Sequence, residues 1–162
     1  MSKLAKALTA AAGNAGGEAL YVEDVFSTDL YTGTGSAQTI TNGIDLDGEG
    51  GLVWNKLRDF GSITNSGYYN HWLTDTARGA GRTALNSNTT DAAGDSAVDN
   101  VISSFNSDGF TLSSIGSVAS GSTGVSWTFR KAEKFFDVVT YTGDGSGDRV
   151  ISHSLNSTPA RS

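Results

Sequence analysis

The stretch "VSWTFRK", residues 125–131, is the clearest β-strand signal in the sequence. Successive side chains of an extended chain point to opposite faces, so Val125, Trp127 and Phe129 share one face and the polar residues between them share the other. Trp54, in "LVWNK", has a similar setting. Both tryptophans are therefore predicted to be core residues of a sheet.

Short stretches of this kind recur along the chain, with turn-forming residues between them. About nine or ten such strands, with turns roughly every 8 to 12 residues, indicate an all-β fold, a β-sandwich or jelly roll. The two stretches on either side of "NSDG" are predicted to form a hairpin. Besides 125–131, the predicted strands lie at 25–33, 39–44, 52–56, 68–75, 83–88, 101–105, 110–115, 135–143 and 149–155.

Composition limits the classes of partner. The chain has a net charge of −6 at pH 7, and an acidic surface repels phosphate backbones, so we expect no nucleic-acid partner. The absence of cysteine excludes disulfides and thiolate metal sites. No stretch approaches the roughly 18 apolar residues that a membrane span requires.

Residues 1–17 are expected to form a separate N-terminal appendage. Leu4, Ala7, Leu8 and Ala11 fall on one face of a short helix, and "GNAGG" after it reads as a flexible linker. A helix this short is marginal in water without a packing partner. We therefore expect these four side chains to dock onto another protein; a frayed tail is the alternative.

The sequence contains no recognisable catalytic or metal-binding motif. "DLDGEG", residues 45–50, matches the start of a calcium loop, but Lys56 stands where a bidentate glutamate is needed. His71 and His153 have no adjacent nucleophile or orienting carboxylate in the sequence. We expect a solvated loop, structural histidines, no metal, no cofactor and no enzyme activity.

The stretch "YYNHWLTD" supplies a candidate sugar-binding patch. Exposed aromatic rings can stack on carbohydrate, and Tyr68, Tyr69 and Trp72 lie close together in it. The stretch that follows, "DTARGAGR", is expected to be a turn stabilised by a contact between Asp75 and Arg78.

One phrase occurs twice. "LYTGTGSAQTI", residues 30–40, is echoed by "TYTGDGSGDRVI", residues 140–151, which indicates a repeated structural unit. We expect residues 18–134 to form the sandwich and residues 135–162 to begin a second repeat. Because strands without partners expose an edge, this C-terminal segment is expected either to close the sandwich beside the first phrase or to pair with a neighbouring subunit.

Five phrases in a fixed order resemble a domain family of tailed phages, especially marine and cyanobacterial ones. The resemblance covers about residues 20–159 and implies a concanavalin-like β-sandwich. One departure is Asn55, where the family commonly has an aliphatic residue. The phrases are "VFSTDLYTGTGSAQTITNGIDLDGEGGLVWNKLRD", "DTARGAGRTALNSNTT", "SFNSDGFTL", "VSWTFRKAEKFFDVVTYTGDGS" and "ISHSLNSTP".

Members of that family are described as tail-fibre or other virion structural proteins. The resemblance therefore implies a non-enzymatic virion protein, a head knob or short fibre that docks through its N-terminus onto a capsid or tail component and can form homo-oligomers. The alternative is a lectin-like module in which Tyr68, Tyr69 and Trp72 contact a host-surface glycan. A glycan-cleaving enzyme is a third reading, and it requires two carboxylates that face each other across a cleft.

Overall fold

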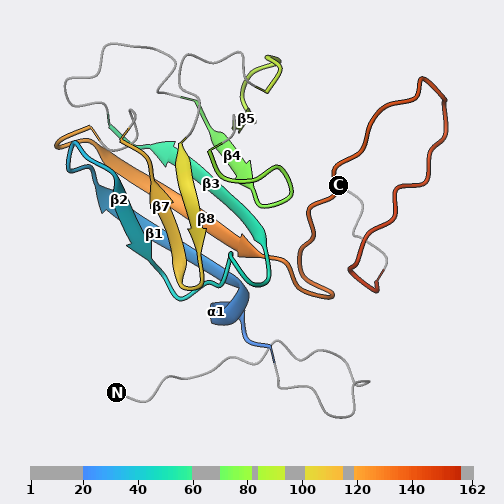
Figure 1. Cartoon of the computed structure of the whole chain (residues 1–162), viewed down its shortest axis with the longest axis horizontal. Helices are drawn as coiled ribbons and strands as arrows, with labels where there is room; N and C mark the ends of the chain where they lie inside the picture. The colour runs from blue at the N-terminus through green and yellow to red at the C-terminus, as the bar shows by residue number, and fades with distance from the viewer. Residues whose placement is uncertain (1–19, 60–69, 82–83, 94–100, 115–118, 158–162) are drawn as a thin grey trace.

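The computed structural model describes residues 20–59, 70–81, 84–93, 101–114 and 119–157, which form two antiparallel sheets (Figure 1). The all-β prediction is confirmed. The larger sheet has the order β1 (Phe26–Thr32), β8 (Thr123–Arg130), β3 (Gly51–Leu57), β4 (Trp72–Asp75), β5 (Leu85–Asn86). The smaller sheet has the order β2 (Gln38–Thr41), β7 (Gly109–Leu112), β6 (Ile102–Asn106).

Helix α1 (Val22–Val25) is a single turn just before β1, and it is the one helix in the described ranges. The backbone N–H of Tyr21 donates to the Asp24 carboxylate at 2.9 Å, which satisfies one of the amide groups at the start of the turn. The predicted N-terminal helix, with Leu4, Ala7, Leu8 and Ala11, lies outside the described residues.

The strands pair in a nested way, the first with the last and the second with the second-last. β1 runs antiparallel to β8 with Phe26 opposite Phe129, and β2 runs antiparallel to β7 with Ile40 opposite Phe110. A jelly roll also folds its chain back on itself in this manner. The predicted hairpin around "NSDG" is confirmed as β6 and β7, with Asn106 opposite Gly109.

The core lies between the two sheets, which pack face to face. Its largest fully buried side chains include Trp72 from the larger sheet and Phe110 from the smaller one, each with no exposed surface. Burial of such apolar area is the main force that holds two sheets together.

The alternation predicted for residues 125–131 is confirmed, but the prediction that Trp54 and Trp127 are core residues is wrong. Ser126 and Thr128 are the fully buried side chains of β8, while both tryptophans are half-buried on the outer face of the sheet. The smaller sheet fills the interior with bulky side chains such as Phe110 and Leu112, which leaves room for small residues on the inner face of β8.

A row of polar side chains crosses the inner face of the larger sheet. Register pairing puts five residues in line, one from each strand: Asp29, Ser126, Asn55, Trp72 and Asn86. The middle three are fully buried, and neither amide atom of Asn55 has a hydrogen-bond partner of normal geometry. Asn55 therefore places an amide in the core close to the Tyr31 hydroxyl. Burial raises the pKa of Tyr31 to about 12, and the Asn55 side chain partly opposes that rise.

The two predicted strands of the C-terminal segment are wrong. Residues 137–157 contribute no strand to either sheet and leave the sandwich as a long open loop (Figure 1). Pairing with the preceding strand is excluded because both edges of β8 are already occupied, by β1 on one side and β3 on the other. Closure of the sandwich by added strands is thus not what the structure shows, and pairing with a neighbouring subunit stays a prediction.

Candidate functional site

The outer face of the larger sheet carries an apolar row. Register pairing aligns one residue from each of the five strands: Thr28, Trp127, Trp54, Leu73 and Leu85. The two tryptophan rings lie 5.4 Å apart at an angle of 58°, and the Trp54 Nε1–H donates to His71 Nδ1 at 3.2 Å. His71 therefore positions an aromatic ring, as expected for a structural histidine, and burial lowers its pKa, with a smaller contribution from Lys56.

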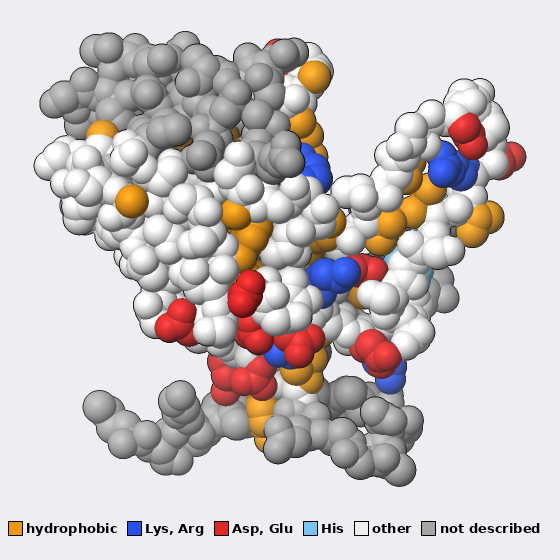
Figure 2. All heavy atoms as spheres, viewed as in Figure 1, with side chains coloured by type: hydrophobic (Ala, Val, Ile, Leu, Met, Phe, Trp, Pro, Cys, Tyr) orange, Lys and Arg blue, Asp and Glu red, His pale blue; other side chains and the backbone are white. Residues whose placement is uncertain are grey.

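The C-terminal segment covers one part of this outer face. The ring of Phe129 packs between Phe26, at 5.0 Å, and Phe136, at 5.3 Å. Beyond this contact the segment and the sheet enclose an open groove of about 720 Å³. Figure 2 shows hydrophobic side chains on both sides of the hollow between the body and the loop. Its apolar lining includes Leu52, Leu73, Leu85, Phe136, Val139 and Tyr141.

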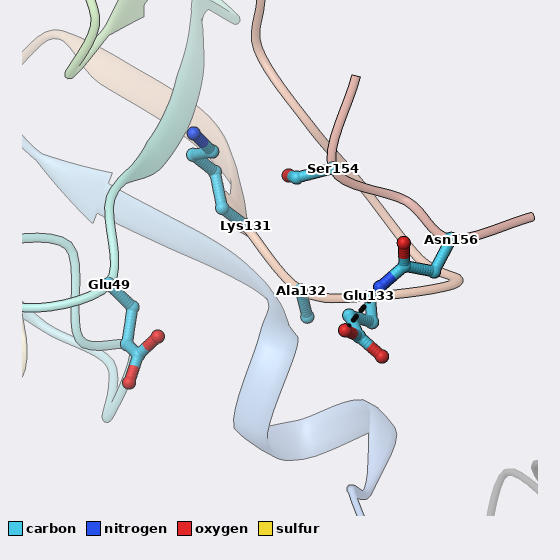
Figure 3. A pocket seen from close by; sticks show the side chains of 6 residues that line it. All are labelled: Glu49, Lys131, Ala132, Glu133, Ser154 and Asn156. Atoms are coloured by element: carbon cyan, nitrogen blue, oxygen red, sulfur yellow. Dashed lines mark hydrogen bonds between the residues drawn. The ribbon is translucent and has the colours of Figure 1, made fainter. Parts of the chain in front are cut away.

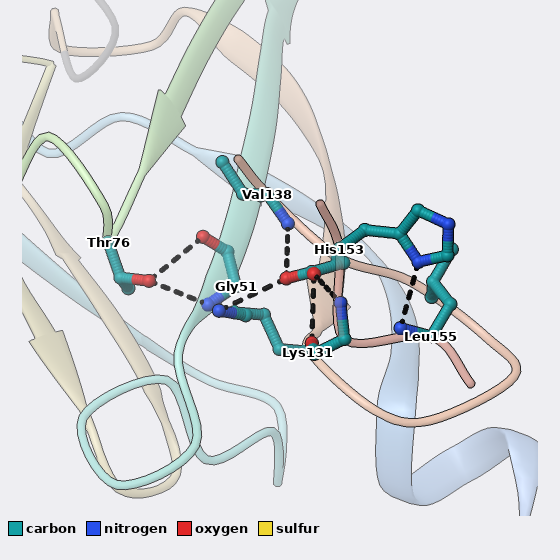
Figure 4. A network of polar contacts seen from close by, with 8 residues as sticks. Gly51, Thr76, Lys131, Val138, His153 and Leu155 are labelled. Carbon is teal, nitrogen blue, oxygen red and sulfur yellow. Dashed lines mark hydrogen bonds and ion pairs between the residues drawn. The ribbon is translucent and has the colours of Figure 1, made fainter. Parts of the chain in front are cut away.

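A polar clamp fixes the base of the C-terminal segment (Figure 4). Asp137 pairs with Lys131 at 3.1 Å, and its other oxygen accepts hydrogen bonds from the backbone N–H and hydroxyl of Ser154, at 2.7 and 2.8 Å. Burial raises the pKa of Asp137, but the hydrogen bonds from Ser154 and the Lys131 ammonium outweigh it and lower the pKa to about 2. The carboxylate thus joins the two ends of the loop while it is ionised.

Acid is expected to release the C-terminal segment. Because the pKa of Asp137 is lower in the folded state, about 2 against 3.8, its stabilisation is complete above about pH 4 and is lost as the pH falls towards 2. Expressed as protection relative to the intrinsic exchange rate at each pH, the amides of Ser154 and Lys134, which donate to the Asp137 carboxylate and the Leu155 carbonyl, should lose protection over that pH range. In an Asp137→Asn variant the exchange should already be fast at neutral pH; equal exchange in both proteins at pH 6 would contradict the clamp.

A smaller polar cavity of about 330 Å³ lies beside the clamp (Figure 3). In Figure 3 Glu133 and Asn156 lie on one side, joined by a hydrogen bond, and Glu49 lies apart from them on the other. No nucleophile with an orienting base is present among these side chains. The lining residues are Glu49, Lys131, Ala132, Glu133, Ser154 and Asn156.

The structure does not support the predicted glycan patch of Tyr68, Tyr69 and Trp72 as a set. Trp72 is fully buried in the core and cannot stack on a sugar, so its assignment as a contact residue is wrong. The alternation of β4 turns Trp72 and Thr74 inward and leaves Leu73 on the outer face. Tyr68 and Tyr69 lie outside the described residues. Among the described residues, Trp54 and Trp127 are the tryptophans that lie half-buried on a sheet surface.

The other sequence candidates have structural roles. The Asp45 carboxylate accepts a hydrogen bond from the Gly48 N–H at 2.7 Å and so closes its own loop. His153 Nδ1 accepts from the Leu155 N–H at 3.2 Å. The predicted contact of Asp75 with the Arg78 side chain is confirmed, with Nε to Oδ2 at 2.7 Å. In the described ranges no three His, Asp or Glu side chains gather in a way that suits a metal ion.

Sequence reasoning missed the clamp and the groove. Asp137 and Ser154 are 17 residues apart on a segment that was expected to form strands, so nothing in their spacing indicates contact. The repeat does contain one indication of the contact near Phe129. Phe136 follows Phe26 by 110 residues, the same spacing that separates the two phrases. It identifies Phe136 as the counterpart of a residue in the sheet.

The fold and the surface features define an all-β protein, a two-sheet sandwich with an open C-terminal segment laid against its outer face. The sequence model of a domain of unknown function, DUF7483, matches residues 22–161, and the chain belongs to this family. The match includes both the sandwich and the C-terminal segment. Searches of curated proteins and of solved structures found no match to the chain. In the described ranges no helix is long and apolar enough to cross a membrane.

Proposed function

We propose that this chain is a non-enzymatic structural protein of a phage particle, a head knob or short fibre whose sandwich projects from the surface. Its N-terminal residues, with Leu4, Ala7, Leu8 and Ala11, dock onto a capsid or tail component. The observation that carries the proposal is the ordered set of phrases, which resembles that of virion proteins of tailed phages.

The fold supports this proposal because the shared phrases coincide with its framework. The first phrase, residues 25–59, contains β1, β2 and β3, and the phrase at 104–112 contains most of β6 and all of β7. The phrase at 125–146 contains most of β8 and the start of the C-terminal segment. The resemblance therefore extends over strands of both sheets.

Imaging of purified particles tests the proposal. We expect the sandwich density to vanish from particles whose copy of the protein lacks residues 1–17, because the anchor is gone. The double substitution Leu4→Asp and Leu8→Asp should have the same effect, while Lys3→Ser with Lys6→Ser, which changes the same segment outside its apolar face, should leave the density in place. Persistence of the density in the first two variants would exclude the N-terminal anchor, and absence of the protein from every particle would exclude the virion role.

Glycan binding is the second candidate function, and the outer face favours it. Half-buried Trp54 and Trp127 lie next to each other there, beside a groove of about 720 Å³. Aromatic faces of this kind can stack on sugar rings. Their tilt of 58° prevents a single flat platform, so each ring would hold a different sugar unit. Binding of the purified chain to bacterial surface glycans, lost in Trp127→Ala, would place this function first.

A further inference from the structure

The second copy of the repeated phrase has kept the local shape of the first. Counterpart residues are 110 positions apart up to Ser36 and Ser146, and 111 apart from Ile40 and Ile151 onward. Gly35 has φ of 82° and its counterpart Gly145 has φ of 77°, a left-handed conformation that favours glycine. The same turn therefore stands at the same place in both copies.

A second local feature is also repeated. In the first copy the Asn42 side chain accepts a hydrogen bond from the N–H two residues on, at Ile44, and in the second His153 accepts one from Leu155, both at 3.2 Å. These positions correspond by the 111-residue offset. The likeness has a limit, because Gly43 has a positive φ and its counterpart Ser154 does not.

The apolar residues of the first copy face the core, and their counterparts do not. Tyr31 is 7% exposed in the first copy, whereas Tyr141 is 66% exposed. Ile40 is buried in β2, while Ile151 is half-buried on the loop. Residues 138–152 make no backbone–backbone hydrogen bond to another residue that the structure describes. The second copy thus has the shape and the apolar side chains of a sheet segment but no partner strands.

The first copy lies at an open edge of the sandwich. β1 is the terminal strand of the larger sheet and β2 is the terminal strand of the smaller one, and no described strand pairs with the far side of either. β1 and β2 carry neither lysine nor proline, the residues that commonly protect such edges, and Asp29 is their one charge.

We propose that residues 138–152 of one chain add to the β1 and β2 edges of a second copy of the same chain. Two chain paths with the same turns at the same spacing can lie side by side and pair along both strands, as in β-strand addition. The added copy runs parallel to the first, so that each half extends its own sheet and Tyr141 extends the core beyond Tyr31. Donor and acceptor are different surfaces, so the contact repeats head to tail. This inference goes beyond the proposed function and holds whether or not the chain is part of a virion.

Sedimentation of the full chain over a range of concentrations tests the inference. We expect reversible self-association that Tyr141→Asp weakens about tenfold or more, because the contact would bury an unpaired charge. Thr142→Asp is the matched control, since it adds the same charge at the adjacent position, whose counterpart Thr32 is exposed in β1. Both sites are exposed in the chain described here, so both variants should melt like the parent. A chain that stays monomeric at every concentration, or equal weakening by both variants, would overturn the inference.

Disulfide trapping then decides where the segment binds. The natural chain has no cysteine, so Leu30→Cys in one chain and Thr140→Cys in another report on a single pair of counterparts. We expect a cross-linked dimer from this mixture and none from Leu30→Cys with Asp148→Cys. If Thr140→Cys instead links to Val125→Cys, the residue opposite Leu30 on β8, the segment has displaced β1 rather than extended it. That result would overturn the edge contact.

Discussion

Trp72→Ala is expected to lower the free energy of unfolding by about 3 to 5 kcal/mol, the largest loss that we predict for a truncated side chain. Trp72 has no exposed surface and belongs to the cluster between the two sheets. Its indole N–H has no hydrogen-bond partner, so the loss comes from packing and from the cavity left behind. Urea denaturation followed by far-ultraviolet circular dichroism measures it.

Trp127→Ala is the matched control, because it removes the same side chain from the outer face, where the ring is half-buried. We expect it to lose less than half as much stability as Trp72→Ala. The two variants also distinguish a core role of Trp72 from a glycan contact. Substitution of a residue that contacts a sugar would reduce binding and leave the stability of the protein unchanged. Equal losses in the two variants would contradict the assignment of inner and outer faces.

Gly51→Ala is expected to cost about 3 kcal/mol or more, because it would force apart two central strands. A Cβ atom at Gly51 would lie 2.0 Å from the carbonyl oxygen of Phe129 and 2.8 Å from a methyl group of Leu46. The Phe129 oxygen is part of the β8 backbone, so it cannot rotate away as a side chain would. A fall in the midpoint of thermal unfolding, with less soluble protein, is the expected observation.

Gly147→Ala provides the comparison for Gly51→Ala. No atom lies within 4 Å of the position that its Cβ would occupy, and its φ is not positive. The substitution should leave the unfolding midpoint unchanged. If Gly51→Ala also left the unfolding midpoint unchanged, that result would contradict the close approach of β3 to β8 at Gly51.

Alternation and turn residues were sufficient to predict the fold class and most of the strands. The strand at 125–131 and the hairpin around "NSDG" were predicted within about three residues of their ends. Periodicity could not decide which face of β8 is buried, because an apolar face is expected inside and here the second sheet had already filled that space. Ser126 and Asn55 are therefore buried on the inner face, and Trp54 and Trp127 lie on the outer face.

The candidate site was harder to predict because it depends on which strands find partners. Residues 135–143 have a strand-like composition, but β1 and β3 occupy both edges of β8, so the segment cannot pair with the strand that directly precedes it. Local sequence carries no information on such competition between distant segments. The clamp of Asp137, Lys131 and Ser154 depends on the same competition, because the segment that it holds is not paired in the sheet.

The nested pairing of β1 with β8 also sets the order in which the chain can fold. Phe26 pairs with Phe129, which is synthesised about a hundred residues later. β1 therefore leaves the ribosome well before its partner strand β8 has been made. Folds dominated by such distant contacts form slowly, typically in milliseconds to seconds. The second copy of the phrase emerges directly after β8, within reach of the same strand and at the moment when β1 must bind it. Correct folding therefore requires that β1 pairs with β8 before the second copy of the phrase does.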